Sequence, residues 1–272
     1  MTSSPGSASS FNTATGEIDK MDTLDRYRAL MDRVAEAARR SGRQKEDIIV
    51  VLVSKYGTLE QMRKLIEIGH LDFAESRAQQ LEQRSVQIAE WLTRLREVPA
   101  SGGEGVVPEA VRWHMVGHLQ RNKTRKAIAH ARLIHSVDSL RLAEDIQSLA
   151  AKRETPVEVL VQVNISGEPQ KSGVAPPAVR HLIDQIDTMV NVSVRGLMCM
   201  AEDTEDTDKL RATFTRCREL FDETRNVGGG GEGFNILSMG MSNDFELAIE
   251  CGANCIRIGS AVFQDEGREA ST

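Results

Sequence analysis

The feature that most constrains this chain is a regular alternation of short apolar runs with stretches of helical periodicity. Eight runs have the length and composition of strands, at 48–53, 71–73, 112–116, 133–137, 157–165, 192–197, 235–237 and 255–258. The first is six consecutive aliphatic residues, which is typical of a strand that is covered on both faces. Because a helix between successive strands leaves no tight hairpins, the alternation favours parallel pairing.

The stretches between these runs predict helices and the way they begin and end. Helices are expected at 24–41, 140–151, 177–189, 206–225 and 243–250, with further helical segments in other gaps. Gly42 ends the first, and Thr58 with Gln61 forms a capping box for the helix after the first strand.

Eight strand–helix units in about 250 residues match the size and the number of units of the (β/α)8 TIM barrel, an α/β fold. The sequence therefore predicts a single barrel domain. The helix at 24–41 is expected to cover the barrel wall where an eighth helix would normally pack. A doubly wound open sheet is the alternative, but no G-x-G-x-x-G motif follows an early strand.

Composition excludes several classes of protein. The 272 residues are 40% apolar and 27% charged, which is typical of a globular chain. Lys and Arg total 34 against 40 Asp and Glu, and the resulting net charge of −6 argues against a general polyanion binder. No apolar run approaches the length that spans a bilayer.

The ends and loops complete the expected domain organisation. Residues 1–20 are expected to form a disordered tail rather than a signal peptide, 21–265 the barrel, and 266–272 a C-terminal tail. The Gly-rich stretches at 99–109 and 226–233 are predicted to be surface loops within this domain.

The cysteines indicate a compartment rather than a site. Cys199, Cys217, Cys251 and Cys255 include no C-x-x-C pair, and no second pair or histidine cluster accompanies the last two. We therefore expect small buried thiols, no bound metal and a cytoplasmic protein.

In a barrel of this kind the residues that follow each strand form the active face. Lys55 comes directly after the first strand, where burial in the barrel mouth would lower its pKa and make its amine a nucleophile for an aldehyde. A lysine that simply reaches solvent past the strand end is an equally good interpretation of its position alone.

The ends of the last two strands indicate an anion site. Small residues and hydroxyls follow the seventh strand in 237–242 and the eighth in 257–261, where barrels commonly bind a phosphate. Ser242 in this stretch is also a good cap for the next helix. A reactive lysine opposite a phosphate site describes pyridoxal 5′-phosphate (PLP), whereas a phosphorylated sugar would use the anion site without explaining the lysine.

Eight motifs, in order and at fitting spacing, carry a resemblance to one family. They are VLVSK (51–55), WHMVGHLQRNK (113–123), HSVD (135–138), QVNIS (162–166), KSG (171–173), RGLM (195–198), LSMGMS (237–242) and RIGS (257–260). Over residues 25 to 264 the chain resembles the PLP homeostasis proteins, single-domain relatives of the alanine racemase barrel.

The resemblance implies roles for six residues. Lys55 would hold the cofactor as a Schiff base, and Ser238, Gly240, Gly259 and Ser260 would bind its phosphate. Arg257 would lie near the pyridine nitrogen, where a guanidinium that keeps its proton leaves the ring a weak electron sink.

The chain departs from the family pattern at three places. Ser76 replaces an asparagine after the second strand, Tyr56-Gly57 replaces a Thr-Lys-Pro-like turn after Lys55, and Ser260 stands where threonine is commoner. In the family this asparagine would face the cofactor, so the change to Ser76 puts that contact in question.

A PLP-dependent amino-acid racemase is the alternative function. Racemases of this barrel type add a second domain whose tyrosine acts as the opposite acid or base, and this chain ends at Thr272, about where the barrel closes. Its two tyrosines fit poorly, because Tyr27 lies on an apolar helix face and Tyr56, if strand-like, points away from Lys55.

Two further features have weaker functional interpretations. Arg121, Lys123, Arg125 and Lys126 form a basic cluster that could contact nucleic-acid phosphates, although a solvated helix face explains it better. His114, His118 and His135 lie at strand ends and are expected to be core or rim residues, not metal ligands.

Lys171 follows the fifth strand on the same barrel face. It is a secondary candidate for handling the cofactor, although an exposed loop lysine is the better interpretation.

Taken together, the sequence predicts a barrel, monomeric or weakly dimeric, that binds PLP on Lys55. It would buffer this vitamin B6 cofactor or deliver it to PLP-dependent apo-enzymes, without strong catalysis of its own. No membrane partner is expected.

Overall fold

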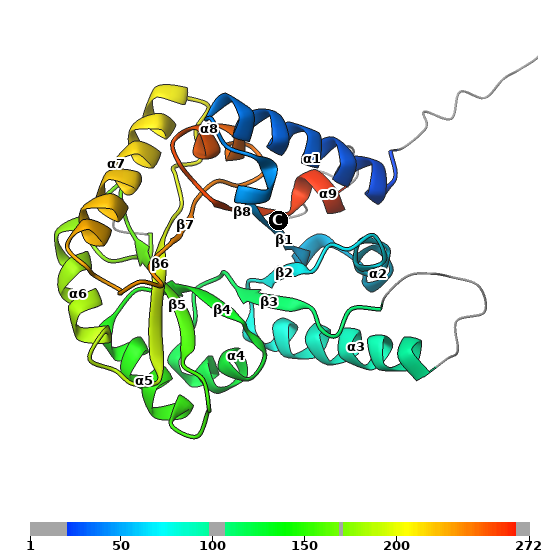
Figure 1. Cartoon of the computed structure of the whole chain (residues 1–272), viewed down its shortest axis with the longest axis horizontal. Helices are drawn as coiled ribbons and strands as arrows, with labels where there is room; N and C mark the ends of the chain where they lie inside the picture. Colours follow the sequence, from blue (N-terminus) through cyan, green and yellow to red (C-terminus); the bar gives the residue numbers. More distant parts are fainter. Residues whose placement is uncertain (1–20, 98–106, 169–170, 265–272) are drawn as a thin grey trace, which may run out of the picture.

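A computed structural model describes residues 21–97, 107–168 and 171–264, and in it eight parallel strands close into one barrel (Figure 1). The strands are β1 (Ile49–Val53), β2 (Asp72–Glu75), β3 (Arg112–Met115), β4 (Leu133–Val137), β5 (Val157–Val163), β6 (Val192–Cys199), β7 (Ile236–Ser238) and β8 (Cys255–Ile258). They pair in sequence order, and β8 returns to pair with β1 in parallel. The closed sheet confirms the predicted barrel and excludes the open doubly wound sheet.

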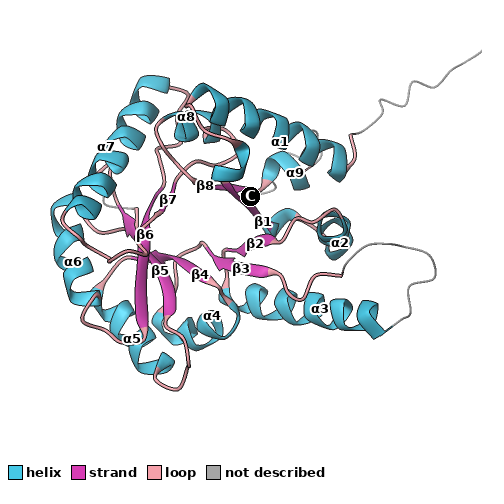
Figure 2. Cartoon of the chain, viewed as in Figure 1, coloured by secondary structure: helices cyan, strands magenta, loops and turns pink. Residues whose placement is uncertain are grey.

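Helices surround the strands on the outside (Figure 2). They are α1 (Thr23–Arg40), α2 (Leu59–Glu67), α3 (Ala78–Glu97), α4 (Thr124–His130), α5 (Leu140–Ala150), α6 (Val179–Ile186), α7 (Thr207–Asn226), α8 (Phe245–Glu250) and α9 (Ser260–Phe263). The predicted capping box is present, because Thr58 Oγ1 accepts from Gln61 N at 3.2 Å and Gln61 Oε1 accepts from Thr58 N at 2.9 Å. The predicted helix at 177–189 is shorter as α6, because a 3-10 turn with two prolines precedes it.

Helix α1 closes the helical ring, as its position in the sequence predicted. It packs against α8 on one side and against α9 and α2 on the other (Figure 1). Arg26 Nε donates to Val262 O at 2.8 Å, and Arg43, just beyond α1, donates from Nη1 to Ala253 O at 2.8 Å. The helix before β1 therefore takes the place that a full helix after β8 would occupy.

The two faces of the sheet pack differently. Outward-facing residues such as Leu52, Phe73 and Ile258 join the helices in one large core. The inward-facing apolar side chains form two small clusters, Val51, Ala74 and Cys255 in one and Leu133, Leu160 and Met198 in the other, with Ile236 against both. These small clusters share the barrel interior with buried polar side chains.

One glycine is required for the sheet to close on itself. Gly196 in β6 has a φ of +149°, and a Cβ there would lie 1.7 Å from Ile236 O of β7. No other residue permits this approach of the two backbones.

The loop predictions are tested only in part. The stretch at 226–233 begins with the last residue of α7 and continues as turns, as expected. The predicted tails at 1–20 and 266–272, and residues 99–106 of the other loop, lie outside the described residues. Among the helices that are described, none is both long and apolar enough to cross a membrane.

Candidate functional site

The predicted site residues come together because β7, β8 and β1 are neighbours in the barrel. β7 pairs with β8, and β8 pairs with β1 with Leu52 opposite Ile258. The segments that leave the carboxyl ends of these strands therefore meet at one edge, and they carry Lys55, Gly240, Gly259 and Ser260. A Cβ on Gly259 would lie 3.3 Å from Val53 O and 3.9 Å from the Tyr56 ring, so this backbone passes directly beside the turn of Lys55.

Lys55 lies on a 3-10 turn, Ser54–Tyr56, and its side chain is exposed. Of the two interpretations of its position, the one in which the lysine reaches solvent is therefore the correct one, because the turn carries Lys55 out past the end of β1. Its Nζ lies 4.4 Å from the centroid of the Tyr56 ring. Tyr56 was expected to point away from Lys55 on a continuing strand, and the turn instead brings the two side chains together.

A buried ion pair holds this turn from outside the strands. Arg84 of α3 donates from Nη1 to Ser54 O at 2.5 Å and from Nη2 to Gly57 O at 2.9 Å. Its Nε lies 3.2 Å from Oε1 of Glu75, and the same oxygen accepts from Ser54 Oγ at 2.6 Å. Burial raises the pKa of the Glu75 carboxyl, and its Oε2 has no hydrogen-bond partner in the described part of the chain. Arg84 thus ties both ends of the turn that presents Lys55.

The segments after β7 and β8 meet at one point, where two backbone N–H groups of the second segment converge on a serine hydroxyl of the first. Gly259 N and Ala261 N each lie 3.4 Å from Ser242 Oγ, at the start of α9. Gly240 has a φ of +96°, and a Cβ on it would lie 2.7 Å from the Ala248 side chain. Ser242 therefore faces the loop after β8 rather than capping α8, whose N-cap residue is Asp244. Converging N–H groups of this kind suit an anion.

Arg257 is buried inside the barrel beneath this edge. It is 5% exposed, and it donates from Nη1 to Ser238 Oγ at 2.7 Å and from Nη2 to Cys199 O at 2.9 Å. Ser238 is fully buried, and its Oγ also lies 3.0 Å from His135 Nδ1. Ser238 thus lies below the loop that contains Gly240, with its hydroxyl engaged within the barrel.

Other predicted residues occupy the rim. Ser76 follows β2, and a Cβ on Gly117 would lie 2.2 Å from Ser76 O, so these two strand ends are in contact. Lys171 pairs with Glu168 at 2.5 Å and lies 3.4 Å from Ala201 O, so it is not the solvent-exposed lysine expected. Pro169 and Gln170 between them lie outside the described residues.

The basic cluster at the start of α4 is partly neutralised. Arg121 Nη2 donates to Asp145 Oδ1 at 3.0 Å, and Lys126 pairs with Glu82 of α3. Two of the four cations therefore already have carboxylate partners, which weakens the nucleic-acid interpretation.

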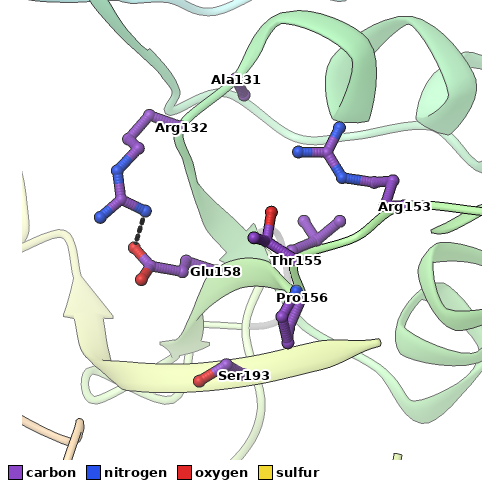
Figure 3. A pocket seen from close by; sticks show the side chains of 8 residues that line it. Ala131, Arg132, Arg153, Thr155, Pro156, Glu158 and Ser193 are labelled. Atoms are coloured by element: carbon purple, nitrogen blue, oxygen red, sulfur yellow. Dashed lines mark hydrogen bonds and ion pairs between the residues drawn. The ribbon is translucent and has the colours of Figure 1, made fainter. Parts of the chain in front are cut away.

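A separate pocket lies at the opposite, amino-terminal end of the barrel. It has a volume of about 510 Å³ and is lined by Ala131, Arg132, Arg153, Thr155, Pro156, Val157, Glu158 and Ser193 (Figure 3). The ion pair of Arg132 with Glu158 spans its wall (Figure 3). These residues precede or begin β4, β5 and β6, so the pocket is remote from Lys55.

The sequence interpretation missed two contributors, because no role was predicted for Glu75 or Arg84. Ser242 was included in the anion-binding stretch and was also considered as a cap, and in the structure it faces the loop after β8. His114 and His135 were correctly placed in the core but were given no role. The alternation of side chains along a strand could have indicated their role. His114, His135 and Arg257 occupy inward positions of otherwise apolar strands, so all three point into the barrel.

Known proteins resemble this chain over nearly its whole length. Residues 26–266 match the family model described as alanine racemase, N-terminal domain. A protein of Helicobacter pylori strain J99 named pyridoxal phosphate homeostasis protein is 33% identical over 247 residues, which cover 90% of this chain and all of that protein.

Solved structures agree with the sequence matches. A protein of Bifidobacterium adolescentis described as unknown has a TM-score of 0.79 and 30% identity, and the match covers 89% of this chain and 94% of that one. PipY of Synechococcus elongatus PCC7942, solved with PLP bound, has a TM-score of 0.67 and 29% identity, with 85% and 99% covered. The chain belongs to the alanine racemase N-terminal domain family and, within it, to the pyridoxal phosphate homeostasis proteins.

Proposed function

We propose that this protein binds pyridoxal 5′-phosphate with the Lys55 amine as its covalent attachment point, and keeps the cofactor in reserve for other proteins. The observation that supports the proposal is the contact between the Lys55 turn and the loop after β8, because the backbone of Gly259 lies beside Val53 and Tyr56 and its N–H converges with that of Ala261. The homeostasis proteins named above and the PLP-bound PipY support it.

The residues present fit this cofactor at both of its ends. We assign the phosphate to the backbone of Gly240, Gly259 and Ser260, since Gly259 N lies 3.4 Å from Ser242 Oγ, where the two loops meet. Ser238 contributes from below by holding Arg257. When bound, the cofactor supplies an aldehyde that reacts reversibly with amines and a ring that withdraws electrons.

Two arguments favour storage over catalysis. The resemblance implies that Arg257 would lie near the ring nitrogen, where a guanidinium that keeps its proton would leave the ring weakly activated. Two-base racemisation also needs an acid or base on the face opposite the lysine. Tyr27 OH bonds to His70 on the outer side of the sheet, and the Tyr56 ring lies against the Lys55 amine itself.

The test is direct observation of the covalent link. Adding pyridoxal phosphate to the protein should produce a new absorbance band, and borohydride should attach the cofactor to Lys55, as read by peptide mass spectrometry. Lys55→Ala should lose the band and bind at least about tenfold more weakly, since a covalent contribution is gone.

Lys64→Ala is the matched control, because Lys64 is an exposed lysine on the outside of the barrel. It should behave as the wild type. A wild-type protein that stays colourless, or a label on another lysine, would contradict the proposal. Turnover of L-alanine to D-alanine would support the racemase instead.

We further propose that PLP-dependent apo-enzymes in the cytoplasm receive the cofactor, and that the protein acts as a monomer or weak dimer. Free thiols at Cys199, Cys217 and Cys255 suit a reducing compartment. Loaded protein should activate an apo-enzyme faster than the same concentration of free cofactor. Equal or slower activation would leave storage without delivery.

A further inference from the structure

Five side chains form a continuous hydrogen-bonded chain through the barrel interior. Arg257 Nη1 is 2.7 Å from Ser238 Oγ, which is 3.0 Å from His135 Nδ1. His135 Nε2 is 3.0 Å from His114 Nδ1, and His114 Nε2 is 3.2 Å from Asp72 Oδ1. The chain thus runs from the cofactor edge on β7 and β8 to the first residue of β2 at the other end of the barrel.

The two ends of this hydrogen-bonded series differ in whether they donate or accept hydrogen bonds. Arg257 can only donate hydrogen bonds. Asp72 is held as a carboxylate that only accepts, because Arg112 contacts both of its oxygens, at 2.8 and 2.6 Å. Burial opposes ionisation of Asp72, but the hydrogen bonds from Arg112 and His114 lower its pKa well below the ordinary value of 3.8.

Because Arg257 can only donate and Asp72 can only accept, two neutral imidazoles between them can carry their protons in only one arrangement. His114 must donate from Nε2 to Asp72, so its Nδ1 accepts from His135 Nε2. His135 Nδ1 then accepts the hydroxyl proton of Ser238, whose oxygen accepts from Arg257. Burial, together with His114 and Arg257, lowers the pKa of His135 well below 6.5, which agrees with a neutral ring.

We infer that His114 and His135 are positioning residues that orient the Ser238 hydroxyl and, through it, Arg257 at the cofactor ring. Each imidazole has its proton on Nε2, so every donor in the chain points from Arg257 toward Asp72. With Cys199 O on its other terminal nitrogen, Arg257 is fixed at two points. The part that concerns the ring rests on the proposed function, whereas the proton order does not.

The Ser238 hydroxyl does not donate to the phosphate. The single proton of Ser238 is committed to His135, so this hydroxyl has none to donate to a phosphate oxygen. The anion must therefore be bound by other donors, which agrees with the backbone N–H groups after β8.

The proton order can be tested in the protein without cofactor. Nitrogen-15 NMR of the imidazoles at neutral pH should show His114 and His135 as neutral rings protonated on Nε2. Ser238→Ala should shift the Nδ1 resonance of His135 toward that of an unbonded nitrogen. Ser136→Ala is the matched control. Ser136 is buried like Ser238 and lies next to His135 on β4, but it has no hydrogen-bond partner within the described chain. An imidazolium, or a proton on Nδ1 of either ring, overturns the inference.

The effect on Arg257 is tested with two substitutions of His135. His135→Asn keeps an acceptor near the Nδ1 position, whereas His135→Leu removes it. The leucine variant should bind pyridoxal phosphate about tenfold more weakly and shift the absorbance maximum of the bound form, and the asparagine variant should restore both in large part. Equal behaviour of the two variants overturns the positioning role.

Should the leucine variant not fold, Ser238→Ala replaces it and should weaken binding in the same way. A protein that binds no cofactor at all refutes the proposed function, and the NMR result still decides the proton order.

Discussion

At the scale of single residues, His70 is a buried histidine that should make the stability of this protein depend on pH. His70 is 8% exposed, and its Nε2 lies 2.9 Å from Asp72 O while its Nδ1 lies 3.2 Å from Tyr27 OH. The backbone carbonyl can only accept, so Nε2 carries the proton and Nδ1 accepts from the tyrosine. This residue thus fastens α1 to the start of β2.

The pKa of His70 predicts a pH dependence of stability. Burial lowers this pKa from 6.5 to about 4, so the unfolded chain takes up the proton first as the pH falls. The contribution of His70 is complete above pH 6.5 and is lost between pH 6.5 and about 4, by about 3 kcal/mol in total.

His70→Gln should remove this slope while keeping a donor for Asp72 O. In urea unfolding, the wild type should be more stable at pH 7.5, and its advantage should shrink or reverse at pH 4.5. His181→Gln, at an exposed position of α6, is the control and should keep the wild-type slope. A constant difference between wild type and His70→Gln at all pH values would contradict this account.

At the scale of elements, the turn after β1 depends on a helix far away in the sequence. Arg84 of α3 binds the carbonyl groups of Ser54 and Gly57, on either side of Lys55, and pairs with buried Glu75. A 3-10 turn alone is too short to hold a reactive side chain in one place. The long side chain from α3 supplies that restraint.

Arg84→Met should therefore affect both stability and cofactor binding. Leaving the Glu75 carboxylate without its partner should cost about 3 kcal/mol in urea unfolding, and binding of pyridoxal phosphate should weaken because the Lys55 turn loosens. Adding Glu75→Gln to this variant should recover part of the stability but not the binding.

Arg33→Met is the matched control, because Arg33 forms an exposed ion pair with Glu246. It should cost less than about 1 kcal/mol and leave binding unchanged. The proposed restraint of the Lys55 turn by Arg84 is ruled out if Arg84→Met binds the cofactor as well as the wild type does.

At the scale of the whole molecule, α1 belongs to the same core as the barrel. Its buried apolar residues, Leu30, Val34, Ala37 and Ala38, join the main cluster between strands and helices. It also fills the gap between α8 and α2 (Figure 1). A helix built into the core in this way should not unfold on its own.

Val34→Ala should lower the free energy of unfolding by about 2 kcal/mol, because it leaves a cavity beneath α1. Circular dichroism and tryptophan fluorescence should report the same shifted midpoint, although both tryptophans, Trp91 and Trp113, lie on α3 and β3. Asp32→Ala on the exposed side of α1 should change neither signal. A separate early loss of helix with unchanged fluorescence would show that α1 is an independent unit.

Much of the site could be predicted from strand ends alone. Lys55, Gly240, Gly259 and Ser260 follow strands that the apolar runs mark clearly, and parallel pairing brings those ends to one edge. Strand ends left the exposure of Lys55 open and could not predict its contact with Tyr56, because both depend on a 3-10 turn rather than on the strand that precedes it.

The amino-acid sequence by itself determined the elements of this protein, their parallel pairing and the edge where its chemistry belongs. Period and composition are local properties, and each acts within a few residues of the chain. Only the tertiary structure decided that Ser238 meets His135, 103 positions away, and that Arg84 reaches Ser54 across 30. Hydrogen bonds of this kind form between side chains that the closed barrel brings within about 3 Å of each other. A local sequence pattern does not determine which distant side chains come that close.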